Sequence, residues 1–154
     1  MVGAGSEMID KVLFADTVGN FLGKKYRLGA QGPDAYDCFS FKYCFYRELG
    51  FEIPLPFEGY TLDNYPDRYK QEPAAATDAM LRLLRSCGTP VERNYMLPGD
   101  LAICHASDAT DGFMGAIYMG RGNFLAMHTS HGSIVLPMKD VRFTDIEVRR
   151  LCPT

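Results

Sequence analysis

The stretch that decides the fold is YRLGAQGPDAYDCFSFKYCFYRELGFEIP, which covers residues 26–54. Its first part, up to Asp37, is rich in glycine, proline and aspartate and is typical of a loop. From Cys38 to Leu49 the apolar side chains recur at helical spacing, and Gly50 follows at the position of a helix-ending residue. The segment therefore predicts a loop that leads directly into an amphipathic helix whose first residue is Cys38.

That position suits a nucleophile. A thiol attacks carbonyl groups as a thiolate, and an ordinary cysteine, with a pKa of about 8.5, is mostly protonated at neutral pH. The start of a helix favours the negative thiolate, so the position of Cys38 is expected to lower the pKa of its thiol. The alternative is that Cys38 packs as a small apolar residue. Asp34 and Asp37, in the loop before the helix, are expected to cap it rather than to act as a catalytic acid and base.

The rest of the chain divides into helices and then strands. Helices are expected over residues 9–22 and about 75–87, and a long, partly irregular loop over residues 54–73. Five short apolar or alternating segments then predict strands: DLAICHA, FMGAIYMG, NFLAMHTS, SIVLPM and IEVRRL. This order predicts one α+β domain over residues 1–154, with N-terminal helices packed on an antiparallel sheet of five to six strands.

Composition excludes several classes of function. The net charge is −3 and no Lys/Arg cluster appears, so nucleic acid is not an expected partner. No apolar run approaches the roughly 20 residues of a membrane span. The first ten residues lack the features of a secretory signal, which predicts synthesis without export by that route. Five scattered cysteines form no CxxC pair, and His128 and His131 lack further ligands at a zinc spacing, so no metal or cofactor is expected.

Two parts of the sequence resemble one family, the NlpC-type papain-like cysteine peptidases. The first is the segment quoted above, with its tyrosine, Gly-rich loop, Asp-Cys pair and helix. The second is LPGDLAIC followed by MGAIYMG and NFLAMH, in the order of the family's strands. The chain is most similar to members found in phage tails and gene transfer agents. The resemblance implies cleavage of peptide bonds in bacterial peptidoglycan by a cysteine, a histidine base and a third, orienting polar residue.

Applied to this sequence, the resemblance makes Cys38 the nucleophile, with its backbone N–H helping to stabilise the oxyanion. Tyr26 would lie beside it as a supporting hydroxyl, or would simply pack on the edge of the sheet. At the position of the histidine base stands Met114, whose thioether cannot accept a proton, and Ala126 stands at the orienting position. The element after Asp37 is also altered, because Phe39 follows the cysteine.

Two residues could replace the missing base. His128 lies two residues after Ala126 and so on the same face of the expected strand. His105, at the end of an earlier strand, is the weaker candidate. The alternative is that both are ordinary strand residues without a catalytic role.

Two hypotheses follow from this pattern. The first is a component of a phage tail tip or related injection particle, built on an inactive NlpC-type fold. It would be made in the cytoplasm of the bacterial host, reside in the virion tail, and contact other tail-tip or baseplate proteins, with bacterial peptidoglycan as a further candidate partner. The alternative is an active cysteine endopeptidase that cleaves peptidoglycan stem peptides during DNA entry, with Cys38 and a substitute histidine.

Overall fold

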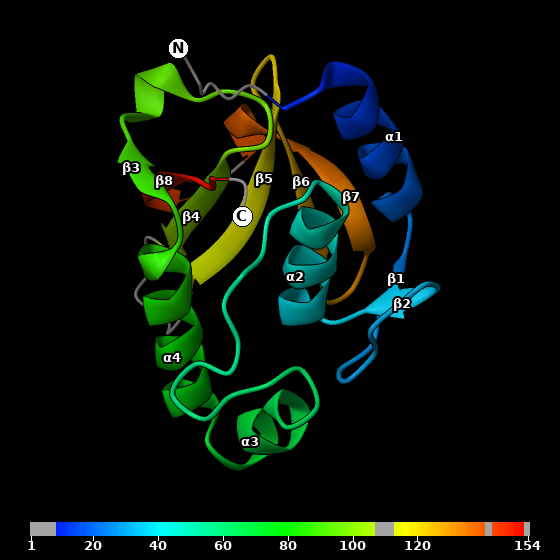
Figure 1. The fold of residues 1–154 in the computed structure, drawn as a ribbon, viewed down its shortest axis with the longest axis vertical. Coiled ribbons are helices and arrows are strands. Elements are labelled where there is room, and N and C mark those ends of the chain that lie inside the picture. The colour runs from blue at the N-terminus through cyan, green and yellow to red at the C-terminus, as the bar shows by residue number, and fades with distance from the viewer. Residues whose placement is uncertain (1–8, 107–112, 141–142, 153–154) are drawn as a thin grey trace.

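Helices cover one face of an antiparallel sheet in a computed structural model that describes residues 9–106, 113–140 and 143–152 (Figure 1). The four helices are α1 Lys11–Phe21, α2 Cys38–Glu48, α3 Tyr65–Gln71 and α4 Pro73–Ser86. The six-stranded sheet consists of β3 Thr89–Val91, β4 Leu101–Ala106, β5 Phe113–Gly120, β6 Asn123–His128, β7 Gly132–Pro137 and β8 Phe143–Arg150. Its strand order is β3-β8-β4-β5-β6-β7, and all its pairs are antiparallel. A short parallel pair, β1 Lys25–Tyr26 and β2 Ala35–Tyr36, precedes α2. The predicted α+β class and sheet are confirmed.

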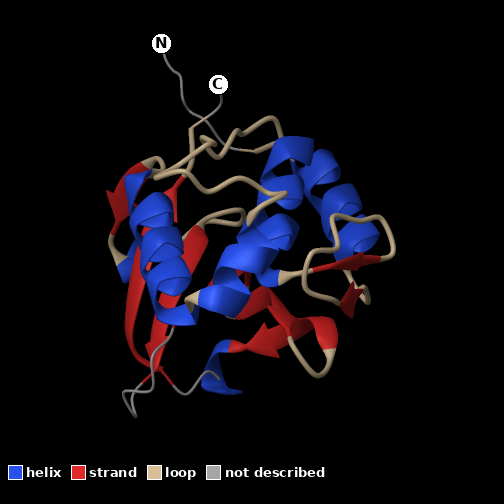
Figure 2. Cartoon of the chain, turned by 90° about the horizontal axis from the view of Figure 1, so that it is seen from below, coloured by secondary structure: helices blue, strands red, loops and turns tan. Residues whose placement is uncertain are grey.

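The sheet separates two groups of buried side chains. Ile103, Ile117 and Leu125 face the helices and belong to the main core with residues of α1, α2 and α4. Their neighbours along the strands, such as Cys104 and Phe124, point to the other face and form a smaller cluster. This alternation follows from the two-residue period of a strand. Figure 2 shows the helices gathered on one side of the strands.

The start of α2 is held by the capping that the sequence predicted. Asp37 is its N-cap residue, and its Oδ1 accepts a hydrogen bond from the Ser40 N–H at 2.8 Å, while Ser40 Oγ accepts one from the Asp37 N–H at 3.0 Å. The second carboxylate oxygen accepts from the Gly29 N–H at 3.0 Å, and Ser40 Oγ donates to the Ala30 carbonyl at 2.6 Å. The loop is thereby tied to the helix that presents Cys38. Asp34 lies exposed before β2 and is not the cap.

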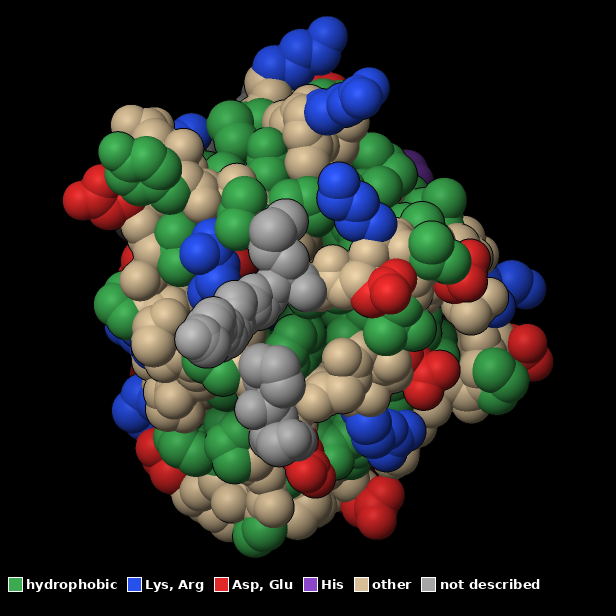
Figure 3. Space-filling model, turned by 45° about the horizontal axis from the view of Figure 1, so that its top comes forward, with side chains coloured by type: hydrophobic (Ala, Val, Ile, Leu, Met, Phe, Trp, Pro, Cys, Tyr) green, Lys and Arg blue, Asp and Glu red, His purple; other side chains and the backbone are tan. Residues whose placement is uncertain are grey.

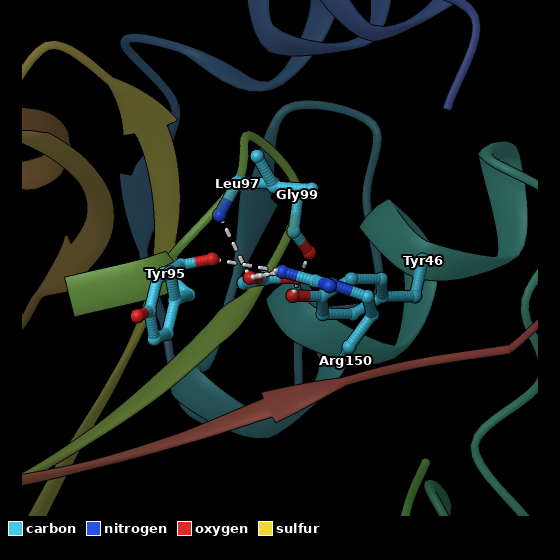
Figure 4. A network of polar contacts seen from close by, with 6 residues as sticks. Tyr46, Tyr95, Leu97, Gly99 and Arg150 are labelled. Carbon is cyan, nitrogen blue, oxygen red and sulfur yellow. Dashed lines mark hydrogen bonds and ion pairs between the residues drawn. The ribbon is translucent and has the colours of Figure 1, made fainter. Parts of the chain in front are cut away.

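A buried polar network ties α2 to the beginning of β4 (Figure 4). Asp100 is only 3% exposed, and its carboxylate binds the Arg150 guanidinium through two hydrogen bonds of 2.9 and 2.8 Å. The same carboxylate accepts from the Leu97 N–H at 2.8 Å, and Tyr46 Oη donates to the Gly99 carbonyl at 2.9 Å. Because Tyr46 belongs to α2 and Arg150 to β8, the network fixes the helix relative to the sheet.

The structure corrects two expectations. Residues 54–73, predicted as a largely irregular loop, include the seven-residue helix α3, and α4 begins at Pro73 rather than near residue 75. Pro66 lies in the first turn of α3, where proline needs no hydrogen-bond partner for its nitrogen. The strand β3 was also missed, because it contains Pro90. It pairs only with β8 at the edge of the sheet, where a proline is tolerated.

The face of the molecule drawn in Figure 3 is mixed in character. Figure 3, with the top of the molecule turned forward, shows basic, acidic and hydrophobic side chains interspersed among the described residues of that face. In the described part of the chain, no helix combines the length and apolarity needed to cross a membrane.

Candidate active site

Cys38 opens into a pocket of about 290 Å³ on the helix side of the sheet. Side chains and backbone from β1, α2, α3, α4, β5 and β6 form its walls. The lining residues are Tyr26, Asp37, Cys38, Phe39, Lys42, Tyr65, Tyr69, Thr77, Met80, Leu84, Phe113, Met114, Gly115, Met127, His128 and Thr129. Most of this surface is aromatic or aliphatic, with a few polar groups near the thiol, as in pockets that bind small organic ligands.

The thiol of Cys38 points towards β6. It donates to the carbonyl oxygen of Met127, with 3.7 Å between sulfur and oxygen. Burial raises the pKa of the Cys38 thiol; the Lys42 ammonium opposes this rise, and Asp37 adds to it. Desolvation therefore opposes the lowering of this pKa that the helix start is expected to produce.

The Met127 carbonyl oxygen can accept this hydrogen bond because β5 and β6 stop pairing with each other at the pocket. Their pairing runs from Gly120–Asn123 to Ile117–Leu125. Beyond it, residues 113–116 pair with β4 on one side, and residues 126–128 pair with β7 on the other. The N-terminal turn of α2 faces the place where the two strands separate.

The register of these strands locates the residues expected at the base and orienting positions. Met114 contributes to the wall of the pocket, but its side chain packs against the cluster on the opposite face of the sheet, so no histidine is supplied from this position. Ala126 is buried in the cluster on the opposite face of the sheet, away from Cys38. From β6 the pocket is lined by Met127 and His128, and not by Ala126.

Of the two candidate histidines, only His128 has a side chain within the described part of the structure. His128 lines the pocket and is exposed; its Nδ1 accepts a hydrogen bond from the Ser130 N–H at 3.0 Å, and its ring lies 4.7 Å from that of His131. Nε2 of His128 is therefore the nitrogen that could exchange a proton with a ligand. His105 lies in β4 and pairs with Phe113, but its side chain falls outside the described part of the structure. A role for either as a substitute base stays a prediction.

Tyr26 lies in β1 and also lines the pocket. Burial raises the pKa of its hydroxyl to about 12, and the charges of Cys38 and Asp37 contribute to the rise. The hydroxyl is therefore protonated at neutral pH and available as a hydrogen-bond donor. Its supporting role beside Cys38 remains a prediction, and its position in the pocket fits that role.

Lys42 is the pocket residue that sequence reasoning missed. It lies one helical turn after Cys38 on α2, is only 7% exposed, and its Nζ donates to the Cys38 carbonyl oxygen at 2.6 Å. Burial lowers the pKa of this amine, while Cys38 and Asp37 act to raise it. The signal that could have found it was the spacing of four residues from the nucleophile, which puts both side chains on one helix face. Among the described residues, no group of three or more His, Cys, Asp or Glu side chains forms a metal-binding cluster.

Solved structures with the same fold come from several organisms. NlpC1 from Trichomonas vaginalis superposes with a TM-score of 0.62 at 21% identity, over 90% of this chain and 42% of that one. The NlpC/p60 domain of the peptidoglycan hydrolase SagA gives 0.61 at 17% identity, over 92% and 100% of the two chains. RipD from Mycobacterium tuberculosis, described as a non-catalytic NlpC/p60 domain protein adapted to peptidoglycan binding, gives 0.56 at 16% identity, over 94% and 99%.

These likenesses establish the fold, and this chain spans less than half the length of the NlpC1 structure. No curated protein matches the sequence. The sequence model of the NlpC/P60 family matches residues 23–149, which include the loop before α2, α2 itself and the sheet strands that form the pocket. The chain therefore belongs to the NlpC/P60 family.

Proposed function

We propose that this domain binds stem peptides of bacterial peptidoglycan in the pocket around Cys38, and that its fold has lost the family's histidine-dependent cleavage. The observation that carries this proposal is the pocket itself, which keeps the cysteine at the helix start, while position 114 of β5, where the resemblance requires a histidine, holds a methionine. A methionine cannot take a proton, and the pocket wall remains largely apolar. RipD, described as adapted to peptidoglycan binding, supplies a structural parallel.

The setting we propose for this binding is the tail tip of a phage or a related injection particle, with other tail-tip or baseplate proteins as partners. The support is the sequence similarity to phage-type members in the loop and helix of residues 26–54. Mass spectrometry of purified particles, followed by immunogold labelling, tests the location. Particles that lack the protein would contradict it.

Binding can be tested by blocking the pocket from its α4 side. Thr77 lines the pocket, so Thr77→Arg would project a long charged side chain into it. Ala75 is exposed on the same helix and is not among the lining residues, so Ala75→Arg is a control with the same added charge. We expect Thr77→Arg to weaken the binding of a soluble muropeptide at least tenfold in calorimetry, and Ala75→Arg to leave it unchanged. Equal binding by both variants would place the peptide elsewhere, and no binding by the unaltered domain would overturn the proposal.

A second candidate is the active endopeptidase, and one observation favours it. The thiol of Cys38 lies inside the pocket with a buried amine, Lys42, hydrogen-bonded to the same residue. Cleavage of muropeptides that disappears in Cys38→Ala would establish this activity. Chromatography that shows only intact peptide after prolonged incubation would leave binding as the function.

A further inference from the structure

Lys42 is a buried cation without a carboxylate partner in the ion pairs found among the described residues. Lysine is rarely buried to this extent unless it is paired, because removing an ammonium group from water is costly. The contact that the amine makes is to the carbonyl oxygen of Cys38, at 2.6 Å. A costly burial at a candidate nucleophile calls for an explanation beyond packing.

The helix directs this amine back towards Cys38. Side chains on an α-helix lean towards its N-terminus, so a lysine at position i+4 lies over the turn that carries residue i. Cys38 and Lys42 both line the pocket, which places the thiol and the amine in one enclosed space.

Gly115 of β5 provides the room for the lysine stem. A Cβ atom added at Gly115 would lie 2.9 Å from both Cδ and Cε of Lys42 and 3.2 Å from Nζ. The amine therefore lies against β5 at the residue next to Met114, the position at which the resemblance requires a histidine. Position 114 of β5 holds no base, but Lys42 of α2 lies next to it and has an amine that can accept a proton.

We propose that Lys42 is the proton acceptor for the Cys38 thiol, in place of a histidine, and that the pair cleaves the amide bond of a bound stem peptide. This inference rests on the second candidate function and on the pocket as the peptide site.

The reaction balances with water as the only co-reactant. The neutral amine of Lys42 takes the thiol proton while sulfur bonds to the peptide carbonyl carbon. The resulting ammonium gives that proton to the departing nitrogen as the C–N bond breaks, which leaves a thioester on Cys38 and a free amine. Water then attacks the thioester, so that the acid is released and the thiol is restored. Burial lowers the pKa of Lys42, which favours the neutral form of the amine that this step requires.

The titratable groups around the pair come from four elements. Tyr26 of β1 and Tyr65 of α3 have pKa values raised by burial and remain neutral, and Tyr69 of α3 also lines the pocket. Asp37 is engaged as the N-cap of α2, and His128 of β6 lies at the exposed side of the pocket. Because His128 is a second group in the pocket that could exchange a proton with the thiol, pH profiles must be measured in a His128→Gln background as well.

The test is the alkylation rate of Cys38 as a function of pH, read from its own peptide by mass spectrometry. Cys152 is exposed and is first replaced by serine. We expect Lys42→Met to slow alkylation at pH 8 at least tenfold, because the thiol loses its proton acceptor and its cationic neighbour. Lys70→Met, on the exposed side of α3, is the control and leaves the rate unchanged. An unchanged rate in Lys42→Met would overturn the proposal.

A second variant separates proton transfer from charge. Lys42→Arg keeps a cation beside the thiol but cannot exchange a proton near neutral pH. We expect this variant to retain at least half of the alkylation rate and to cleave muropeptides at least 100-fold more slowly. Full cleavage by Lys42→Arg would show that a cation suffices and would refute the proton-acceptor role.

A measurement on the unaltered fold covers the case in which a Lys42 variant does not fold. The Lys42 Cε signal is titrated by NMR in the native domain and in Cys38→Ser. The thiolate raises the pKa of Lys42, so its midpoint is expected to fall when sulfur is removed. An unmoved midpoint would count against the pairing. Muropeptide binding by calorimetry is followed in parallel: binding without Lys42-dependent reactivity would reject this inference alone, and Lys42-dependent reactivity without binding would reject only the substrate.

Discussion

At the scale of single residues, a small number of buried hydrogen bonds hold α2 in its position. Cys38 needs α2 held in one place relative to β5 and β6. The hydrogen bond from Tyr46 to the Gly99 carbonyl anchors α2 near its C-terminal end, within the network of Figure 4.

Removal of that one hydroxyl should be measurable. Tyr46 is fully buried, so Tyr46→Phe leaves the Gly99 carbonyl without this donor and is expected to destabilise the domain by about 1–2 kcal/mol. Tyr43→Phe, on the same helix and only partly buried, should change stability by less than about 0.5 kcal/mol. Urea unfolding followed by circular dichroism gives both values. Equal effects of the two variants would mean that the buried bond contributes nothing specific.

Residue chemistry also marks the limit of what the sequence could predict about the site. Cys38 and Asp37 could be placed because a loop, a cap and an amphipathic helix are local patterns. For Lys42 the four-residue spacing from Cys38 was the one signal, and it is weak, because a lysine among apolar residues usually extends to solvent. Only the fold reveals that Gly115, 73 residues away, leaves the space that lets the lysine stay inside. The rise in the pKa of Cys38 was missed for the same reason, since burial is a property of the packed chain.

At the scale of elements, the fold was predictable where hydrophobic periodicity is strong. The strands β4–β8 were found as alternating segments, and α2 as a helix from its first residue. The helix α3 escaped notice because proline, glycine and tyrosine dominate its surroundings. Its start is nevertheless marked by reciprocal hydrogen bonds between Thr61 and Asn64, at 2.9 and 3.1 Å, and by Pro66.

The substitution of glycine by alanine is expected to have opposite effects on stability at two positions, Gly88 before β3 and Gly19 in α1. Gly88 has φ +59°, and a Cβ atom there would collide with the Arg150 carbonyl of β8. Gly88→Ala is therefore expected to lower the free energy of unfolding by roughly 2–3 kcal/mol.

Gly19, within α1, has open space around it, so Gly19→Ala should raise the free energy of unfolding by about 0.5–1 kcal/mol. Thermal and urea unfolding of both variants provide the comparison. A stabilised Gly88→Ala would mean that the junction of α4 and β3 can rearrange, contrary to the close approach of β8.

At the scale of the whole molecule, many buried hydroxyl and thiol groups make stability sensitive to high pH. Burial raises the pKa of Tyr26 to about 12 and that of Cys104 to about 11, and it raises those of Tyr36 and Tyr65 as well. The folded state holds these protons more tightly than the unfolded state does. The stability that they contribute is therefore complete below the unfolded pKa values, about 8.5 for cysteine and 10 for tyrosine, and is lost as pH rises through the folded values.

Lys42 has the opposite effect on stability, because its pKa is lowered in the folded state. Its charged form destabilises the fold at lower pH, and this cost disappears as pH rises to its ordinary pKa of 10.5. We therefore expect the free energy of unfolding to fall steadily between pH 10 and pH 12. Urea titrations across this range, read by circular dichroism alongside tyrosinate absorbance, provide the measurement. A constant free energy of unfolding would show that the buried tyrosines ionise without loss of structure.

The close fit of Lys42 against Gly115 couples two positions that lie on different elements. Any side chain at position 115 would have its Cβ atom 2.9 Å from Cδ and Cε of the lysine, so the end of the lysine side chain would have to shift. Substitutions at positions 42 and 115 are therefore expected to have non-additive effects on stability and on the reactivity of Cys38.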